Sequence, residues 1–71
     1  MTNPTAAIML IGDEILSGRT QDSNGNYLAK ALFARGIDLR EIRVVGDVAE
    51  TIIATLNTLR DAYDHVFTSG G

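Results

Sequence analysis

Three short segments combine glycine with acidic or hydroxyl side chains, and each follows a run of apolar residues. They are Gly12-Asp13-Glu14, Gly46-Asp47 and Ser69-Gly70-Gly71. The neighbouring carboxylates of Asp13 and Glu14 could accept hydrogen bonds from amino and imino groups of a ligand, or hold a divalent cation. The alternative is that one acid caps the following turn while the other is solvated.

The Ser69-Gly70-Gly71 segment has the composition of a phosphate-binding loop. Two consecutive glycines let backbone N–H groups approach an anion closely, and a helix that followed would add a favourable dipole. The alternative is a flexible turn, because paired glycines are common in loops.

Three other polar positions have both a functional and a structural interpretation. Asp47 could face a ligand in the crevice or cap a helix. Asn24, in the string Asp22-Ser23-Asn24, could likewise contact a ligand or belong to a helix cap. His65 has no partner pattern, so we expect a structural role for it. No G-x-G-x-x-G follows the first apolar run and no G-x-S-x-G is present, which argues against an NAD-binding Rossmann domain and a serine nucleophile elbow.

Hydrophobic periodicity predicts the elements that position these segments. A continuous apolar run is typical of a strand buried on both faces, and apolar residues at helical spacing indicate amphipathic helices. The predicted elements are a strand over Ala6–Ile11, a helix over Ser23–Arg35, a strand nearer an edge over Ile37–Val45, a helix from a capping box at Asp47–Glu50 to Ala62, and a strand over Asp64–Thr68.

Residues at helical spacing and one glycine refine the helices. One face of the first helix holds Tyr27, Leu28, Ala31, Leu32 and Arg35, and a stripe along the second comprises Ile52, Ile53, Leu56, Leu59 and Tyr63. Gly36 stands where a left-handed residue would end the first helix. The order strand-helix-strand-helix-strand predicts an α/β fold with a parallel sheet. At the carboxyl ends of such strands, the three glycine segments should converge on one crevice.

The overall composition excludes several classes of protein. With 45% hydrophobic and 21% charged residues, the chain is typical of a folded domain and not of a disordered tail. It contains no cysteine, which excludes a zinc ribbon, a disulfide scaffold and a thiol nucleophile. The net charge is −3 and the basic residues are scattered, so we expect no nucleic-acid partner. The longest apolar run, Ala6–Ile11, is too short to span a bilayer, and we expect no membrane partner and a cytoplasmic location.

Length limits the architecture. The chain has 71 residues, whereas a parallel sheet with helices on both faces usually takes roughly 100–150 residues. We therefore expect residues 1–71 to be the N-terminal portion of one domain of a longer protein. A second interpretation is a non-catalytic binding or oligomerisation module, whose open sheet edge pairs with another chain.

Several short strings together resemble a known family over the whole chain. They are Ile11-Gly12-Asp13-Glu14-Ile15-Leu16-Ser17-Gly18, Asp22-Ser23-Asn24, Leu32 with Gly36-Ile37, Val45-Gly46-Asp47 and Phe67-Thr68-Ser69-Gly70-Gly71. In order and spacing they resemble the molybdopterin-binding domain family, especially its competence/damage-inducible protein A branch. The resemblance implies a three-layer α/β/α domain that forms a homo-oligomer and binds a small phosphate-bearing ligand.

The resemblance also implies ligands and site residues. The ligand is molybdopterin in one part of the family. In the competence-protein branch it is an ADP-ribose-like nucleotide, whose pyrophosphate bond is hydrolysed with a divalent metal such as magnesium; the sequence leaves the two open. The implied ligand contacts are Gly12, Asp13, Glu14, Asn24, Asp47, Ser69, Gly70 and Gly71, with Asp47 also a metal contact. In the family, a proline and catalytic aspartates follow the two glycines. The resemblance therefore implies catalytic acids beyond Gly71, in a longer enzyme, and an inactive 71-residue portion.

Overall fold

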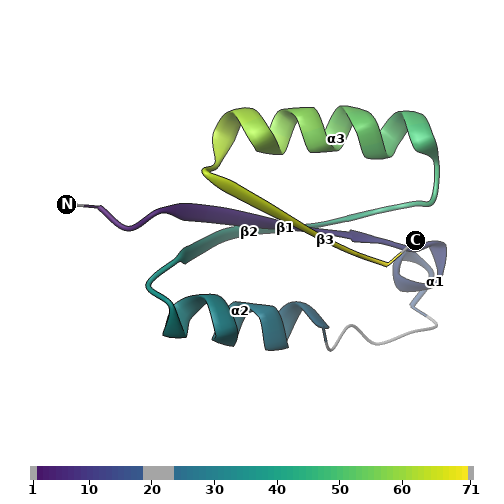
Figure 1. Cartoon of the computed structure of the whole chain (residues 1–71). Coiled ribbons are helices and arrows are strands. Elements are labelled where there is room, and N and C mark those ends of the chain that lie inside the picture. Colours follow the sequence, from purple (N-terminus) through teal and green to yellow (C-terminus); the bar gives the residue numbers. More distant parts are fainter. Residues whose placement is uncertain (1, 19–23, 71) are drawn as a thin grey trace.

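Three parallel strands and three helices make up the described part of the molecule. The computed structural model describes residues 2–18 and 24–70. In chain order the elements are β1 (Thr5–Ile11), α1 (Asp13–Leu16), α2 (Asn24–Ala34), β2 (Asp38–Val45), α3 (Ala49–Ala62) and β3 (His65–Gly70). Figure 1 shows the sheet as a middle layer, with α3 on one face and α2 on the other. The predicted α/β fold with a parallel sheet is confirmed.

The central strand β1 holds the most deeply buried residues. The strand order is β2-β1-β3, so β1 has a parallel neighbour on each side. Residues 6–10 are at most 2% exposed, because helices also cover both faces of this strand. A strand with no solvated face carries no polar side chains, which explains the unbroken apolar run Ala6–Ile11.

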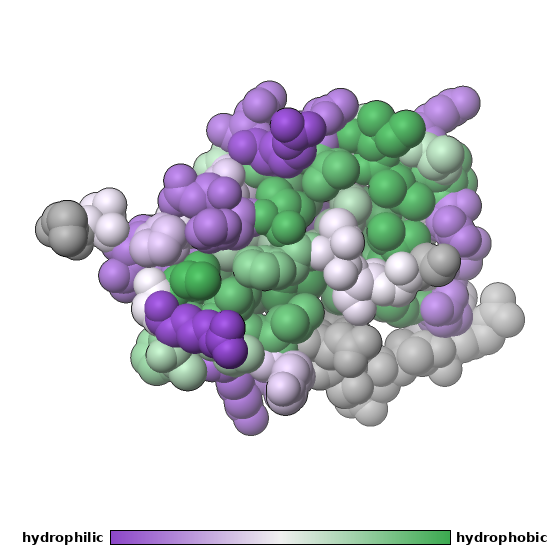
Figure 2. All heavy atoms as spheres, viewed as in Figure 1, coloured by the Kyte–Doolittle hydropathy of each residue, from purple (hydrophilic) through white to green (hydrophobic). Residues whose placement is uncertain are grey.

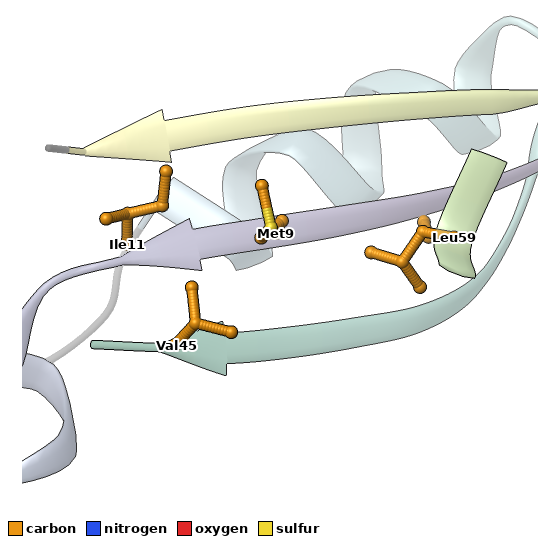
Figure 3. Close-up of a cluster of buried hydrophobic side chains, with 5 residues drawn as sticks. Met9, Ile11, Val45 and Leu59 are labelled. Carbon is orange, nitrogen blue, oxygen red and sulfur yellow. The ribbon is translucent and has the colours of Figure 1, made fainter. Parts of the chain in front are cut away.

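Alternation along β1 divides the core into two layers. The buried residues on the α3 side are Ala7, Met9, Ile11, Val45 and Leu59. Those on the α2 side are Ala6, Ile8, Leu10 and Leu32. Figure 3 shows Met9 and Ile11 beside Val45 of β2, with Leu59 of α3 further along the same face. Each large side chain buried in this way stabilises the fold by roughly 1.5–3 kcal/mol.

Helix α2 ends in the manner that its glycine predicts. Gly36 has a φ of +74°, and its N–H donates to the carbonyl oxygen of Phe33 over 3.1 Å. The N–H of Ile37 donates to the carbonyl oxygen of Leu32 over 3.0 Å, which completes a Schellman motif. The predicted apolar stripe is wrong at Tyr27, which is 73% exposed while Leu32 is buried.

Helix α3 differs from its prediction at two places. The residue that caps its N-terminus is Val48, without a side-chain hydrogen bond, so the predicted capping box at Asp47 is wrong. Ile53 is 59% exposed, because it lies on the flank of the stripe whose centre is the buried Leu59. The predicted end at Ala62 is confirmed. No helix in residues 2–18 and 24–70 is long and apolar enough to cross a bilayer.

A bulge in β2 redirects its side chains. Ala6 pairs with Leu39 but Ala7 pairs with Glu41, so Arg40 is an extra residue in the ladder. In a regular strand, residues 39 and 41 would share a face. The bulge instead lets Leu39 pack in the α2 layer, while Glu41 lies on the α3 side, within reach of Tyr63.

Side-chain hydrogen bonds join the elements at the end of the sheet where the strands begin. The backbone N–H of Thr5 donates to Asp64 Oδ2 over 2.8 Å, and this bond holds the pKa of Asp64 below its usual value. Tyr63 donates its hydroxyl to Glu41 Oε1 over 2.7 Å. This bond, with a second one from Arg43, lowers the pKa of Glu41, and the bond to Glu41 raises the pKa of Tyr63.

Candidate functional site

The carboxyl ends of the three strands lie at one level. Ile11, the last residue of β1, pairs with Val45 of β2 and with Gly70 of β3, which are the last residues of their strands. Figure 1 accordingly shows α1 close to the end of β3, beyond one end of the sheet. The segments Gly12–Glu14 and Gly46–Asp47 therefore leave the sheet at the same end, as predicted.

Asp13 links the loop after β1 to the loop after β2. Its Oδ1 accepts a hydrogen bond from the backbone N–H of Asp47 over 3.3 Å. The backbone N–H of Gly12 also donates to the carbonyl oxygen of Val45 over 3.0 Å. The alternative role for one of these acids was to cap its own following turn, but the Asp13 carboxylate accepts its hydrogen bond from the backbone of the neighbouring loop. Asp13, Glu14 and Asp47 are all exposed, so their remaining lone pairs can meet a ligand.

Two glycines make room for these carboxylates. A Cβ added at Gly46 would lie 2.8 Å from Asp13 Oδ1, and one added at Gly12 would lie 2.8 Å from Glu14 Oε1. Each acid therefore lies directly over a glycine of the strand ends. Gly46 was missing from the predicted ligand contacts, although its place beside Asp47 after an apolar run was a usable signal.

The end of β3 is a strand and not the loop that the sequence predicted. Ser69 and Gly70 pair with Leu10 and Ile11, so the ladder continues two residues past the predicted end at Thr68. Gly70 has a φ of +91°, and an added Cβ would lie 2.3 Å from the carbonyl oxygen of Ile11. Only glycine fits there, because it tolerates both the left-handed backbone and this close approach.

The residues Gly12, Asp13, Glu14, Gly46, Asp47 and Gly70 are called here the strand-end rim. The remaining polar positions singled out from the sequence lie outside this rim or outside the described residues. Asn24 begins α2, but its side chain lies outside the description, as do Asp22, Ser23 and Gly71. His65 begins β3, at the opposite end of the sheet from the rim, with its ring 6.3 Å from that of Phe67.

Two open hollows lie at that opposite end. One of about 440 Å³ is lined by Ala29, Phe33, Ile37, Asp38, Leu39 and Arg40. The other, of about 420 Å³, is lined by Thr5, Arg40, Ala62 and Tyr63. Both hollows therefore lie where the strands begin, whereas the acids and glycines suited to ligand binding lie where the strands end. We favour the rim as the ligand site, because it combines acids with glycine backbone at the strand ends where parallel sheets bind ligands.

Comparison with known proteins identifies the family. Residues 7–71 match the model of a family described as "Probable molybdopterin binding domain". The chain belongs to this molybdopterin-binding domain family. The predicted competence-protein branch is confirmed by relatives that carry its abbreviated name, CinA.

The relatives of this molybdopterin-binding domain fall under two names. A "CinA-like protein" of Mycobacterium avium is 42% identical over 67 residues, covering 93% of this chain and 15% of the relative. A "Probable FAD synthase" of Caenorhabditis elegans is 48% identical over 67 residues, covering 94% of this chain and 13% of the relative. The crystal structure of CinA from Thermoplasma acidophilum superposes with a TM-score of 0.91 at 29% identity, covering 96% of this chain and 40% of that one. The chain thus spans less than a sixth of these two curated relatives.

The strand-end rim of the molybdopterin-binding domain has a donor set suited to magnesium with a phosphate. In the part of the chain that the structure describes, no group of three or more His, Cys, Asp or Glu side chains is placed to hold a metal. Magnesium commonly takes only one or two protein carboxylates and completes its shell with water and ligand phosphates. The exposed carboxylates of Asp13 and Asp47 would supply that number of ligands.

Proposed function

We propose that this domain binds a small phosphate-bearing ligand, molybdopterin or an ADP-ribose-like nucleotide, at the strand-end rim. The observation that carries the proposal is the hydrogen bond from the N–H of Asp47 to Asp13 Oδ1. It fixes two loops from different strands so that exposed acids and glycine backbone share one rim. Membership of the molybdopterin-binding domain family supports the ligand class.

Each part of the rim has a task in the proposed complex. The carboxylates of Asp13 and Glu14 accept hydrogen bonds from amino and imino groups of the ligand. Asp47 contacts the divalent metal, which neutralises phosphate charge when it is bound. Backbone N–H groups at the end of β3 lie against the phosphate. The proposed contacts are Gly12, Asp13, Glu14, Asn24, Asp47, Ser69, Gly70 and Gly71.

In the longer protein, the same rim serves hydrolysis of the pyrophosphate bond of an ADP-ribose-type nucleotide. Water attacks one phosphorus and the bridging P–O bond breaks, which gives AMP and ribose 5-phosphate, with magnesium as the metal. The name of one relative, a probable FAD synthase, supports a nucleotide ligand of this class, because the two halves of FAD are joined by a pyrophosphate bridge.

A second candidate is a binding or oligomerisation module without turnover. The strand order β2-β1-β3 favours it, because one side of β2 and one side of β3 have no neighbouring strand in the described residues. The two candidates differ in whether a bound nucleotide is hydrolysed and in whether an open sheet edge pairs with another chain.

Calorimetry on the full-length protein with ADP-ribose and magnesium tests the proposal. Asp47→Asn keeps the backbone N–H that donates to Asp13 but removes the carboxylate charge. The affinity for ADP-ribose with magnesium should therefore fall about 10- to 100-fold. Asp61→Asn is the matched control, since Asp61 is an exposed aspartate on α3 outside the rim, and its affinity should not change.

Two outcomes separate the candidates, and two others contradict both. Release of AMP by the native protein supports the hydrolase, whereas binding without release favours the module. Unchanged affinity of the Asp47 variant, or no binding of either ADP-ribose or molybdopterin, contradicts a ligand site at the rim.

A further inference from the structure

The edge strand β2 carries charges in a pattern that complements itself. Glu41 and Arg43 lie on the α3 side and form an ion pair within the chain, and Ile42 between them is 45% exposed. Ile42 faces the α2 side, because it pairs with Ile8, which packs in that layer. Charges on an edge strand usually discourage pairing with another chain. Because Glu41 and Arg43 carry opposite charges and lie two residues apart, however, β2 can pair with a second β2 in a register that places each acid opposite an arginine.

A two-fold axis through Ile42 satisfies every charge in the central part of the strand. If a second β2 runs antiparallel across this axis, Ile42 faces Ile42 of the second copy. Glu41 then faces Arg43 of that copy, and Arg43 faces its Glu41, on the same face of the joined sheet. An axis through Glu41 or through Arg43 would place like charges opposite each other. An axis through Leu39 would pair Asp38 with Arg40, but the bulge at Arg40 interrupts the ladder there. Charge and ladder regularity together therefore favour the axis through Ile42.

The ladder is regular where this pairing needs it. Pairing with β1 keeps one constant offset from Glu41 to Val45, and the bulge at Arg40 lies outside this stretch. The segment Glu41–Arg43 is therefore ordinary extended strand with side chains alternating between the two faces.

Helix α2, which covers the same face as Ile42, also carries exposed apolar surface. Phe33 of α2 is 83% exposed, the most of any large hydrophobic residue described. With Leu39 it lines the 440 Å³ hollow beside β2. A second copy across the axis would bring its own α2 to this face and cover apolar surface that is otherwise in water.

We propose that two copies of this chain pair antiparallel along β2, centred on Ile42, to form one continuous sheet with three strands from each copy. The outer side of β3 is the competing edge. Figure 2 shows apolar side chains across the middle of the molecular face on which β3 lies in Figure 1. Within β3 the charge pattern of β2 is absent, since its residues His65–Gly70 include neither Asp, Glu, Lys nor Arg, so no register is selected there.

Single cysteines test the axis directly, because the chain contains no cysteine of its own. In the proposed dimer two Cβ atoms of residue 42 face each other at about 4.5–5.5 Å, close to disulfide range. Mild oxidation of the full chain carrying Ile42→Cys should give a covalent dimer. Ile53→Cys, at an exposed isoleucine on α3, and Thr68→Cys, at an exposed position on β3, are the matched controls.

The result expected is cross-linking of the residue 42 variant at least about tenfold faster than either control. Cross-linking that is no faster than Ile53→Cys, or that is fastest for Thr68→Cys, overturns the proposal. Circular dichroism should confirm that all three variants retain the native helix content, since each substituted residue is exposed.

Sedimentation equilibrium provides a second test through the charges. Arg43→Glu places two glutamates opposite each other on both sides of the axis, so the dimer dissociation constant should rise about tenfold or more. The double variant Glu41→Arg with Arg43→Glu restores opposite charges and should recover most of the affinity. A native protein that stays monomeric, or a double variant as weak as Arg43→Glu alone, overturns the proposal.

Discussion

The substitution Gly70→Ala should destabilise the protein by separating the end of β3 from β1. At this position φ is +91°, and a methyl group would lie 2.3 Å from the carbonyl oxygen of Ile11. An L-residue in the left-handed region costs roughly 1–2 kcal/mol. The contact cannot be relieved by a side-chain rotation, because both atoms belong to or adjoin the backbone. The strand end must therefore move.

The cost of that movement has an upper limit. If the last residues of β3 detach, one or two backbone hydrogen bonds are lost, each worth about 0.5–1.5 kcal/mol. Together with the left-handed backbone, Gly70→Ala should lower the free energy of unfolding by about 1.5–5 kcal/mol. In a domain of this size that corresponds to a fall in melting temperature of about 6 °C or more.

Gly36→Ala is the matched control. Gly36 has a φ of +74°, but a Cβ there would meet no atom within 4 Å. Its variant should therefore show only the backbone cost of about 1–2 kcal/mol. Urea denaturation of both variants measures the difference. If Gly70→Ala costs no more than Gly36→Ala, the approach of β3 to Ile11 has no energetic weight, and the fixed position of this rim residue is refuted.

Three other predictions concern the core and two titrating groups. Leu59→Ala should cost about 2–5 kcal/mol because Leu59 is 1% exposed, whereas Ile53→Ala at a 59% exposed residue should cost less than about 1 kcal/mol; urea denaturation measures both. Asp64→Asn should reduce the loss of unfolding free energy that the protein shows as the pH falls. Because the folded pKa of Asp64 lies below its usual 3.8, its contribution is complete above that value and is lost as pH falls through the folded pKa, which unfolding curves at acidic pH measure. Tyr63→Phe should remove a tyrosinate absorbance step above the usual pKa of 10.0, since the bond to Glu41 raises the pKa of Tyr63. The stability from that bond is present below the usual pKa and is lost as pH rises through the folded one. Three results would contradict the respective predictions: equal costs of Leu59→Ala and Ile53→Ala, the same loss of stability at acidic pH with and without Asp64, and an alkaline absorbance step that Tyr63→Phe leaves unchanged.

The sequence predicted a sheet between two helix layers, because a strand buried on both faces appears in the sequence as an unbroken apolar run. Ala6–Ile11 is apolar without alternation, and the structure buries it between two helices. The four-residue helix α1 was missed, because Asp13–Leu16 is too short to show a helical period. The bulge at Arg40 was missed for a related reason: it depends on how β2 aligns with β1, which no local pattern in β2 records.

For the candidate site, the sequence predicted which segments meet but not how they contact one another. Convergence of Gly12–Glu14 and Gly46–Asp47 follows from parallel strands alone. The capping prediction for Asp47 was wrong, since its backbone N–H donates to Asp13 and Val48 caps the helix. Sequence patterns favour local partners, whereas this hydrogen bond joins residues 34 positions apart and becomes visible only when the loops are placed in space.

The two ends of the sheet hold together by different means, and this has a consequence for separating stability from binding. Where the strands begin, side chains fasten the elements, as in the bonds between Thr5 and Asp64. Where they end, glycine replaces side chains, and the exposed acids retain free lone pairs for a ligand. Changes at the first end should therefore alter stability while the ligand affinity of the folded protein is preserved, and Asp47→Asn should do the reverse. All three strands run from one end of the sheet to the other, and β1 pairs with both of its neighbours along this length. A core substitution that shifts β1 along its axis is therefore expected to alter both properties together, as is Gly70→Ala at the rim itself.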